Sequence, residues 1–83
     1  MSTYLFSIYD SDPSASDGNV WPAYCRHPIE ARSPLAALRA ALKIARAEGA
    51  KYSEYGAGHM LYAHVWGADG RCFDGTVRIG GAR

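Results

Sequence analysis

Hydrophobic and polar residues follow a helical period in one segment of the chain. Between Ser33 and Glu48 (SPLAALRAALKIARAE), apolar residues recur at helical spacing and form one stripe: Leu35, Leu38, Ala41, Leu42 and Ala45. Ser33 is suited to cap the N-terminus of a helix, and Pro34 to occupy its first position, where a proline costs no hydrogen bond. Gly49 is a typical helix stop. The segment is therefore predicted to be an amphipathic helix with one apolar side.

The segments before the helix have the pattern of strands. Thr3–Tyr9 is rich in aromatic and β-branched residues, so a strand is predicted with Tyr4, Phe6 and Ile8 on one face. Leu5, Ser7 and Tyr9 would lie on the other face. Val20–Arg32 is predicted to be an interrupted or edge strand, because Pro22 and Pro28 cannot take regular central positions.

The segments after the helix predict a hairpin. His59–Trp66 (HMLYAHVW) has the strongest strand pattern of the chain, and the glycines of residues 67–70 predict a turn. Arg71–Ile79 would then pair back onto the first strand of the hairpin. Gly75 within it predicts a bulge or a close approach of the backbone.

This order of elements predicts one small α+β domain over residues 1–83, with residues 80–83 as a frayed tail. We expect an antiparallel four-stranded sheet (β-β-α-β-β) with the amphipathic helix packed on one face. Two sets of residues alternate along the third strand. Leu61, Ala63 and Val65 suit the face under the helix, whereas Met60, Tyr62, His64 and Trp66 would project from the face that one helix cannot cover.

The row of Tyr62, His64 and Trp66 has three interpretations. Aromatic side chains on an open sheet can stack nucleic-acid bases, or they can fill a protein interface. Alternatively, another segment of the same chain folds over them and makes a second small core. No RNA-recognition signature accompanies the row.

The net charge argues against a partner that is bound through overall charge alone. The formal net charge of +1 argues against a general polyanion binder and equally against an acidic DNA mimic. Acidic residues gather early in the chain, at Asp10, Asp12 and Asp17. The helix flank carries Arg39, Lys43 and Arg46, which could contact phosphate or an acidic protein, or could simply form a solvated helix face.

The residues offer no motif for catalysis or metal binding. Cys25 and Cys72 are too few for a disulfide framework, and with no secretion signal or membrane-length apolar run a cytoplasmic protein is expected. Ligand types for zinc occur at Cys25, His27, His59, His64 and Cys72. Their spacing is poor, and His59 and His64 have opposite strand parity, so neither a metal site nor a cofactor is expected.

Asp10 and Asp12 open a calcium-like loop that lacks its required glycine and final carboxylate. No nucleophile elbow or phosphate loop is present, so an enzyme is not expected.

Two resemblances add expectations about function. The passage from Ile29–Pro34 into Leu35–Leu38 resembles the strand-to-helix passage of HicB-type antitoxins, which also place a hairpin before one amphipathic helix. In size and organisation, the whole chain resembles the small phage-encoded anti-CRISPR proteins. The second resemblance implies a stoichiometric inhibitor that covers a surface of a bacterial CRISPR effector complex.

Together these observations predict a non-enzymatic protein-binding module. Its contact would centre on Tyr62, His64 and Trp66. The electrostatic rim would come from Asp10, Asp12 and Asp17 or from Arg39, Lys43 and Arg46. A nucleic-acid-binding or antitoxin-like regulator that uses the basic helix flank is the alternative, and a homodimer joined through the open faces is a third possibility. No membrane partner is expected.

Overall fold

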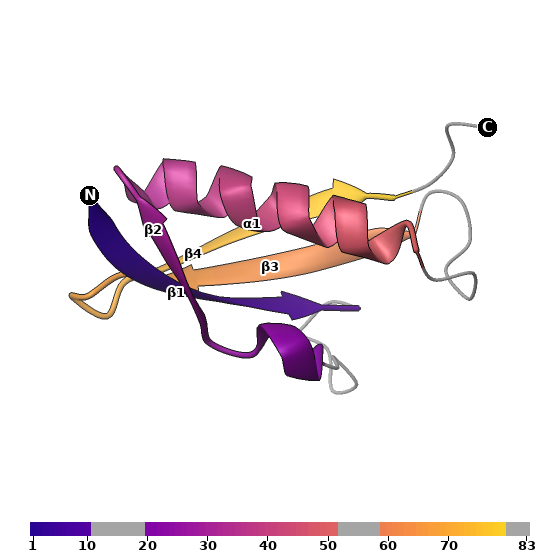
Figure 1. Ribbon diagram of the computed structural model, residues 1–83, viewed down its shortest axis with the longest axis horizontal. Coiled ribbons are helices and arrows are strands. Elements are labelled where there is room, and N and C mark those ends of the chain that lie inside the picture. Colours follow the sequence, from indigo (N-terminus) through magenta and orange to yellow (C-terminus); the bar gives the residue numbers. More distant parts are fainter. Residues whose placement is uncertain (11–19, 52–58, 80–83) are drawn as a thin grey trace.

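The predicted α+β fold is confirmed. The computed structural model describes residues 1–10, 20–51 and 59–79, apart from the side chain of Pro22. In chain order the elements are β1 (Ser2–Tyr9), the short 3-10 helix η1 (Pro22–Tyr24), β2 (His27–Ala31), α1 (Pro34–Gly49), β3 (Met60–Trp66) and β4 (Cys72–Arg78) (Figure 1). The expected tail at residues 80–83, and most of the acidic loop that follows β1, lie outside the described residues.

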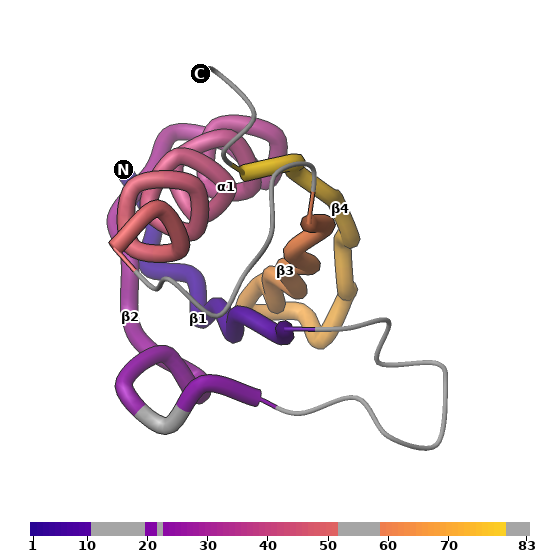
Figure 2. The backbone as a smooth tube through the Cα atoms, turned by 90° about the vertical axis from the view of Figure 1, so that its right-hand side faces the viewer, coloured from indigo at the N-terminus to yellow at the C-terminus, as the bar shows by residue number. Residues whose placement is uncertain are grey.

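The four strands form one antiparallel sheet in the order β2-β1-β3-β4. The N-terminal strand β1 therefore lies inside the sheet, between β2 and β3. As its prolines predict, β2 is at an edge, and Pro28 pairs there with Leu5. The sheet curves, and its concave face holds α1 (Figure 2). No helix among the described residues has the length and apolar character needed to cross a bilayer.

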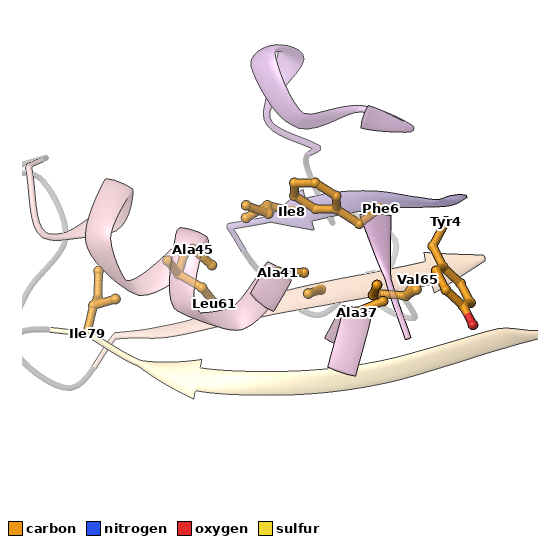
Figure 3. Packing of buried hydrophobic residues seen from close by; sticks show 11 residues of the cluster. Tyr4, Phe6, Ile8, Ala37, Ala41, Ala45, Leu61, Val65 and Ile79 are labelled. Atoms are coloured by element: carbon orange, nitrogen blue, oxygen red, sulfur yellow. The ribbon is translucent and has the colours of Figure 1, made fainter. Parts of the chain in front are cut away.

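Small residues line the contact between α1 and the sheet. The buried residues of the helix are Ala37, Ala41, Ala45 and Gly49, which recur every four positions. The three alanines face the completely buried Leu61 and Val65 of β3 and Phe6 and Ile8 of β1 (Figure 3), and Gly49 packs against Leu61. We call the four helix residues the small-residue seam. Because no side chain in it is larger than alanine, the helix axis can lie close to the strands.

The predicted apolar stripe of the helix is partly wrong. Ala41 and Ala45 belong to the seam, but Leu35 is 56% exposed. Leu38 and Leu42 are half-buried and pack at the side of the core. The reason is the closeness of helix and sheet. A leucine in the seam would not fit, so the leucines contact the sheet from the flank, where β4 leaves room at Gly75.

Both helix ends follow from the sequence, although Gly49 has a different role from the one predicted. The Ser33 hydroxyl accepts a hydrogen bond from the Ala36 amide at 3.1 Å, which confirms the N-cap. Gly49 is the last helical residue rather than the residue that stops the helix, and Ala50 is the C-cap. A Cβ atom on Gly49 would lie 2.6 Å from Leu61 Cδ1. The glycine is thus needed for close packing.

The predicted hairpin is confirmed. In its turn, the Gly67 amide donates to the Arg71 carbonyl at 2.9 Å, and Gly70 has a φ of 86°, which glycine adopts freely. Strand pairing runs without interruption from the pair of Met60 with Arg78 to the pair of Trp66 with Cys72, so Gly75 is not at a bulge. Its other predicted role, a close approach, is confirmed. A Cβ on Gly75 would lie 2.9 Å from Leu42 Cδ1 and 3.1 Å from Leu38 Cδ1.

The segment before β2 is interrupted, as expected from its prolines. Val20 forms an isolated bridge with Tyr9, and the Trp21 amide donates to the Ile8 carbonyl at 2.8 Å. The chain then leaves the sheet through η1 and returns to it at His27. The Tyr24 ring stacks on Phe6 at a centroid distance of 5.7 Å, so the excursion extends the core at this edge.

Replacing Gly75 with valine tests the close packing of helix and sheet. Gly75→Val should lower the free energy of unfolding by about 1–3 kcal/mol, because the new side chain collides with Leu38 and Leu42. Thr76→Val is the matched control. It changes the neighbouring exposed residue on the other face and should stay within about 0.5 kcal/mol of the parent chain. Urea unfolding followed by circular dichroism measures both, and equal effects would contradict the proposed packing.

Candidate functional site: the open face of the sheet

The face of the sheet opposite α1, which we call the open face, carries the aromatic row that the sequence singles out. Residues of β3 alternate strictly between half-buried and buried. Tyr62, His64 and Trp66 are half-buried on the open face, while Leu61 and Val65 are fully buried under the helix. The three rings therefore project as predicted, and none of them is sealed inside the chain.

His64 and Trp66 touch each other on the open face and are contacted by neighbours from other segments. The Tyr9 ring meets the edge of His64 at a centroid distance of 5.1 Å. His64 stacks on Trp66 at 5.8 Å with an interplanar angle of 25°. The Arg26 guanidinium carbon lies 4.9 Å from the centre of the Trp66 ring, in a cation–π position. The imidazole of His64 is thus fixed from two sides.

Arg26 and Ser7 form a contact that the sequence analysis missed. Ser7 pairs with His64 on the open face, yet it is only 1% exposed. The Arg26 amide donates to the Ser7 hydroxyl at 2.9 Å. Arg26 has a φ of 54°, a left-handed conformation that is uncommon for a residue with a side chain. The only signal in the sequence is the interruption of the strand by its prolines, which does not specify where the chain bends.

Of the charged residues expected around the rings, the helix cations lie on the other side of the sheet. Arg39, Lys43 and Arg46 are exposed on α1, which covers the opposite face of the sheet. Asp10 is half-buried at the end of β1, where its carbonyl oxygen contacts His59 Nε2 at 2.8 Å. Asp12 and Asp17 lie outside the described residues. The helix cations and the aromatic row are therefore two separate surfaces.

Other charged residues share the open face with the rings. Strand parity and register place three exposed ones there, Glu30, Asp74 and Arg78, and the contact with Trp66 places a fourth, Arg26. Glu30 also accepts a hydrogen bond from the Thr3 hydroxyl at 2.7 Å across β1 and β2. Positive and negative groups are thus mixed over this face, and the sequence analysis identified none of these four as part of the site.

A cluster of His64, Cys72 and Asp74 lies at the β3–β4 end of the open face. His64 Nδ1 is 2.9 Å from Asp74 Oδ1 and 3.2 Å from Cys72 Sγ, and Cys72 Sγ is 3.5 Å from Asp74 Oδ1. The sequence pattern singles out His64 and Cys72 as ligand types but not Asp74. A turn at residues 67–70, as predicted, would pair residue 66 with residue 71 and residue 64 with residue 73. In the structure residue 66 pairs with residue 72, so residue 64 faces residue 74 and lies diagonally next to residue 72.

The geometry of the cluster does not suit nucleophilic catalysis. In a triad of nucleophile, histidine and carboxylate, the nucleophile and the carboxylate contact different nitrogens of the imidazole. Here Cys72 and Asp74 both approach Nδ1, so proton transfer from the thiol through the ring to the carboxylate has no route. The contacts favour a protonated thiol as well. Partial burial, the hydrogen bond to Asp74 and the negative charge of that carboxylate together raise the pKa of Cys72.

A shallow pocket on the helix side of the sheet is too small to enclose most ligands. Its volume is about 250 Å³, below the usual range for ligand pockets. It lies where β1, the β3–β4 turn and the start of α1 meet, and its lining includes Tyr4, Pro34, Gly67 and Phe73. No cluster of titratable side chains among the described residues adjoins it other than Asp69 with Arg71, which pair with each other at 3.4 Å.

The raised pKa of Cys72 predicts that Asp74 slows the reaction of this thiol. At a pH near 8, the hydrogen bond to Asp74 and the charge of that carboxylate lower the fraction of Cys72 that is thiolate, the reactive form. With a chelator present, iodoacetamide should therefore alkylate Cys72 measurably faster in Asp74→Asn than in the parent chain. The other exposed thiol, Cys25, has no contact with Asp74 among the described interactions and should react at the same rate in both chains. Peptide mass spectrometry over time gives these rates, and unchanged or slower alkylation of Cys72 in Asp74→Asn would contradict the described contacts.

Comparison of the chain with protein-family models, with curated proteins and with solved structures found no match. Among the described residues, two surfaces could bind a partner: the open face with its rings and the outer side of α1 with its cations.

Proposed function

We propose that this chain is a non-enzymatic protein-binding module that docks through the open face of its sheet. The observation that carries the proposal is the position of Tyr62, His64 and Trp66. All three rings lie opposite the helix, and each keeps part of its surface accessible to a partner. Large aromatic side chains that a partner can cover are typical anchors of protein interfaces.

The charges around the rings favour a protein over a nucleic acid. The open face mixes Arg26 and Arg78 with Glu30 and Asp74, whereas a nucleic-acid surface needs a mostly basic track along the phosphates. A net charge of +1 for the whole chain adds no general attraction to polyanions. A protein surface that presents both signs of charge complements this face better.

Two of the three rings are held by neighbours before binding. His64 lies between Tyr9 and Trp66, and Arg26 covers part of Trp66, so these two side chains have few alternative rotamers to lose. Their backbone belongs to β3, an inner strand paired on both sides. Ordered contact groups lower the entropic cost of association.

The specific partner we propose is a bacterial CRISPR effector complex, which the chain would inhibit by occlusion. Support comes from the resemblance in size and organisation to small phage-encoded anti-CRISPR proteins and from the absence of a catalytic arrangement in the described cluster. The near-neutral charge means that inhibition would depend on shape and local charge. This partner would place the protein in the bacterial cytoplasm.

The outer side of α1 supports a second candidate function. Arg39, Lys43 and Arg46 are exposed, and none of them forms an ion pair with another described residue. The row could bind phosphate groups in an antitoxin-like or nucleic-acid-binding regulator. Three cations release few counterions, so such binding would be weak at physiological salt.

Substitution of the rings tests the docking surface. Purified, guide-loaded effector complexes of several types are titrated with the chain, and their binding to labelled target DNA is measured. The parent chain should abolish target binding at a near-stoichiometric ratio with at least one of them. Tyr62→Ala with Trp66→Ala should weaken its affinity by at least about 30-fold, the effect of losing a hot-spot contact. Circular dichroism verifies that the variant folds.

The matched control changes the other surface. Arg39→Ala with Lys43→Ala should leave inhibition within a few-fold of the parent chain, because these residues lie on the opposite side of the sheet. If inhibition is lost in this variant and preserved in the ring variant, the docking surface is wrong. If the chain instead binds DNA or RNA with an affinity that collapses as salt rises from low to physiological concentration, the nucleic-acid alternative is correct.

A further inference from the structure

The open face contains a set of metal-ligand atoms, and two of its three residues, Cys72 and Asp74, are not among the docking rings. His64 from β3 and Cys72 and Asp74 from β4 each direct one ligand atom to the same point: an imidazole nitrogen, a thiol sulfur and a carboxylate oxygen. Their ligand atoms all lie within 4.8 Å of one another, and in the part of the chain that the structure describes no other three potential ligands come together in this way.

The distances within the cluster match those of a zinc coordination shell. From typical Zn–N, Zn–S and Zn–O bond lengths and tetrahedral angles, ligand atoms around zinc lie about 3.4–3.6 Å apart. In the cluster, the separations are 2.9 Å for N–O, 3.2 Å for N–S and 3.5 Å for S–O. Each differs from the expected value by roughly half an ångström or less. Rotation of exposed side chains is sufficient to open the cluster around an ion.

When a metal binds, bonds from the three ligand atoms to the ion would replace the hydrogen bonds within the cluster. Nδ1 carries at most one hydrogen, so it cannot donate to Cys72 and Asp74 at once. A divalent cation at the shared point would instead accept an electron pair from the nitrogen, the thiolate and the carboxylate together. The thiol proton leaves to solvent when the sulfur binds the ion.

The surroundings hold the ligands in this arrangement. Cys72 and Asp74 lie on the same face of β4, and the pairing of Asp74 with His64 fixes their position relative to β3. Tyr9 and Trp66 contact the imidazole ring from two sides and orient Nδ1 toward β4. Neighbours that orient a histidine ligand commonly strengthen metal binding.

We propose that His64, Cys72 and Asp74 form a binding site for one divalent transition-metal ion of the zinc type. Mixed nitrogen, sulfur and oxygen ligands select zinc or cobalt over calcium and magnesium, which prefer oxygen alone. The chain supplies three ligands, and Asp74 is 67% exposed, so water can complete the tetrahedron. This site goes beyond protein docking and does not depend on it.

Cobalt(II) provides a direct test with the chain of 83 residues. The protein is reduced with a phosphine, freed of metal with a chelator and then titrated with Co²⁺ alone. We expect saturation at one ion per chain, a thiolate-to-cobalt charge-transfer band in the near ultraviolet and intense visible d–d bands typical of tetrahedral coordination. Competition with a chromophoric chelator then gives the affinity for Zn²⁺.

Two cysteine variants make a matched pair, because both thiols of the chain are exposed. Cys72→Ser should remove the charge-transfer band and weaken Zn²⁺ binding by at least about 100-fold, more than the loss of a residue that only hydrogen-bonds to a ligand. Cys25→Ser should retain both the band and the affinity. Asp74→Asn should keep the sulfur band but bind Zn²⁺ more weakly than the parent chain.

The melting temperature is a second measurement that does not depend on the spectrum. Zn²⁺ should raise it for the parent chain and for Cys25→Ser but not for Cys72→Ser, since an ion that binds only the folded state stabilises that state. Failure to bind Co²⁺ or Zn²⁺ would overturn the proposal. So would a sulfur–cobalt band that survives in Cys72→Ser and disappears in Cys25→Ser. Neither result would bear on docking, whose test changes Tyr62 and Trp66.

Discussion

The close contact between one helix and the middle of the sheet is the constraint on which this fold depends. Ala37, Ala41, Ala45 and Gly49 leave no room between α1 and β3, and the Cβ positions of Gly49 and Gly75 are already occupied by neighbouring side chains. Interiors packed to this density tolerate little added volume. The core is consequently a single layer between helix and sheet. The side chains of Tyr62, His64 and Trp66 on the open face are not part of it and keep surface for solvent or a partner.

That division of the sheet determines where chemistry is possible. On β3, the buried residues hold the helix and the alternating residues carry Tyr62, His64 and Trp66. Because the β3–β4 hairpin is regular, its register also brings Cys72 and Asp74 to His64. His64 therefore belongs both to the proposed docking surface and to the proposed metal site. An ion held there would add positive charge next to the rings and would fix the imidazole more firmly.

Most of the fold could be predicted from local pattern, and the exceptions have physical causes. The Ser33 cap, the proline-bearing edge strand and the alternation along β3 depend on short-range rules that the structure obeys. The buried side of the helix could not be predicted, because it depends on how closely the sheet approaches. Hydrophobicity alone favoured the leucines, whereas the short distance to the sheet requires alanine and glycine. The site shows the same limit. Periodicity identified the rings, but the Arg26 bend and the convergence on His64 Nδ1 arise from tertiary contacts.

Arg26 combines two opposing effects in one residue. Its left-handed backbone costs about 1 kcal/mol or more compared with glycine at the same place, and the fold tolerates this cost because the amide bonds to Ser7. A glycine there would relax the chain but would remove the guanidinium from the face of Trp66. Backbone stability and the orientation of the indole therefore make opposite demands on position 26: glycine would remove the strain, and arginine keeps Trp66 covered and in place.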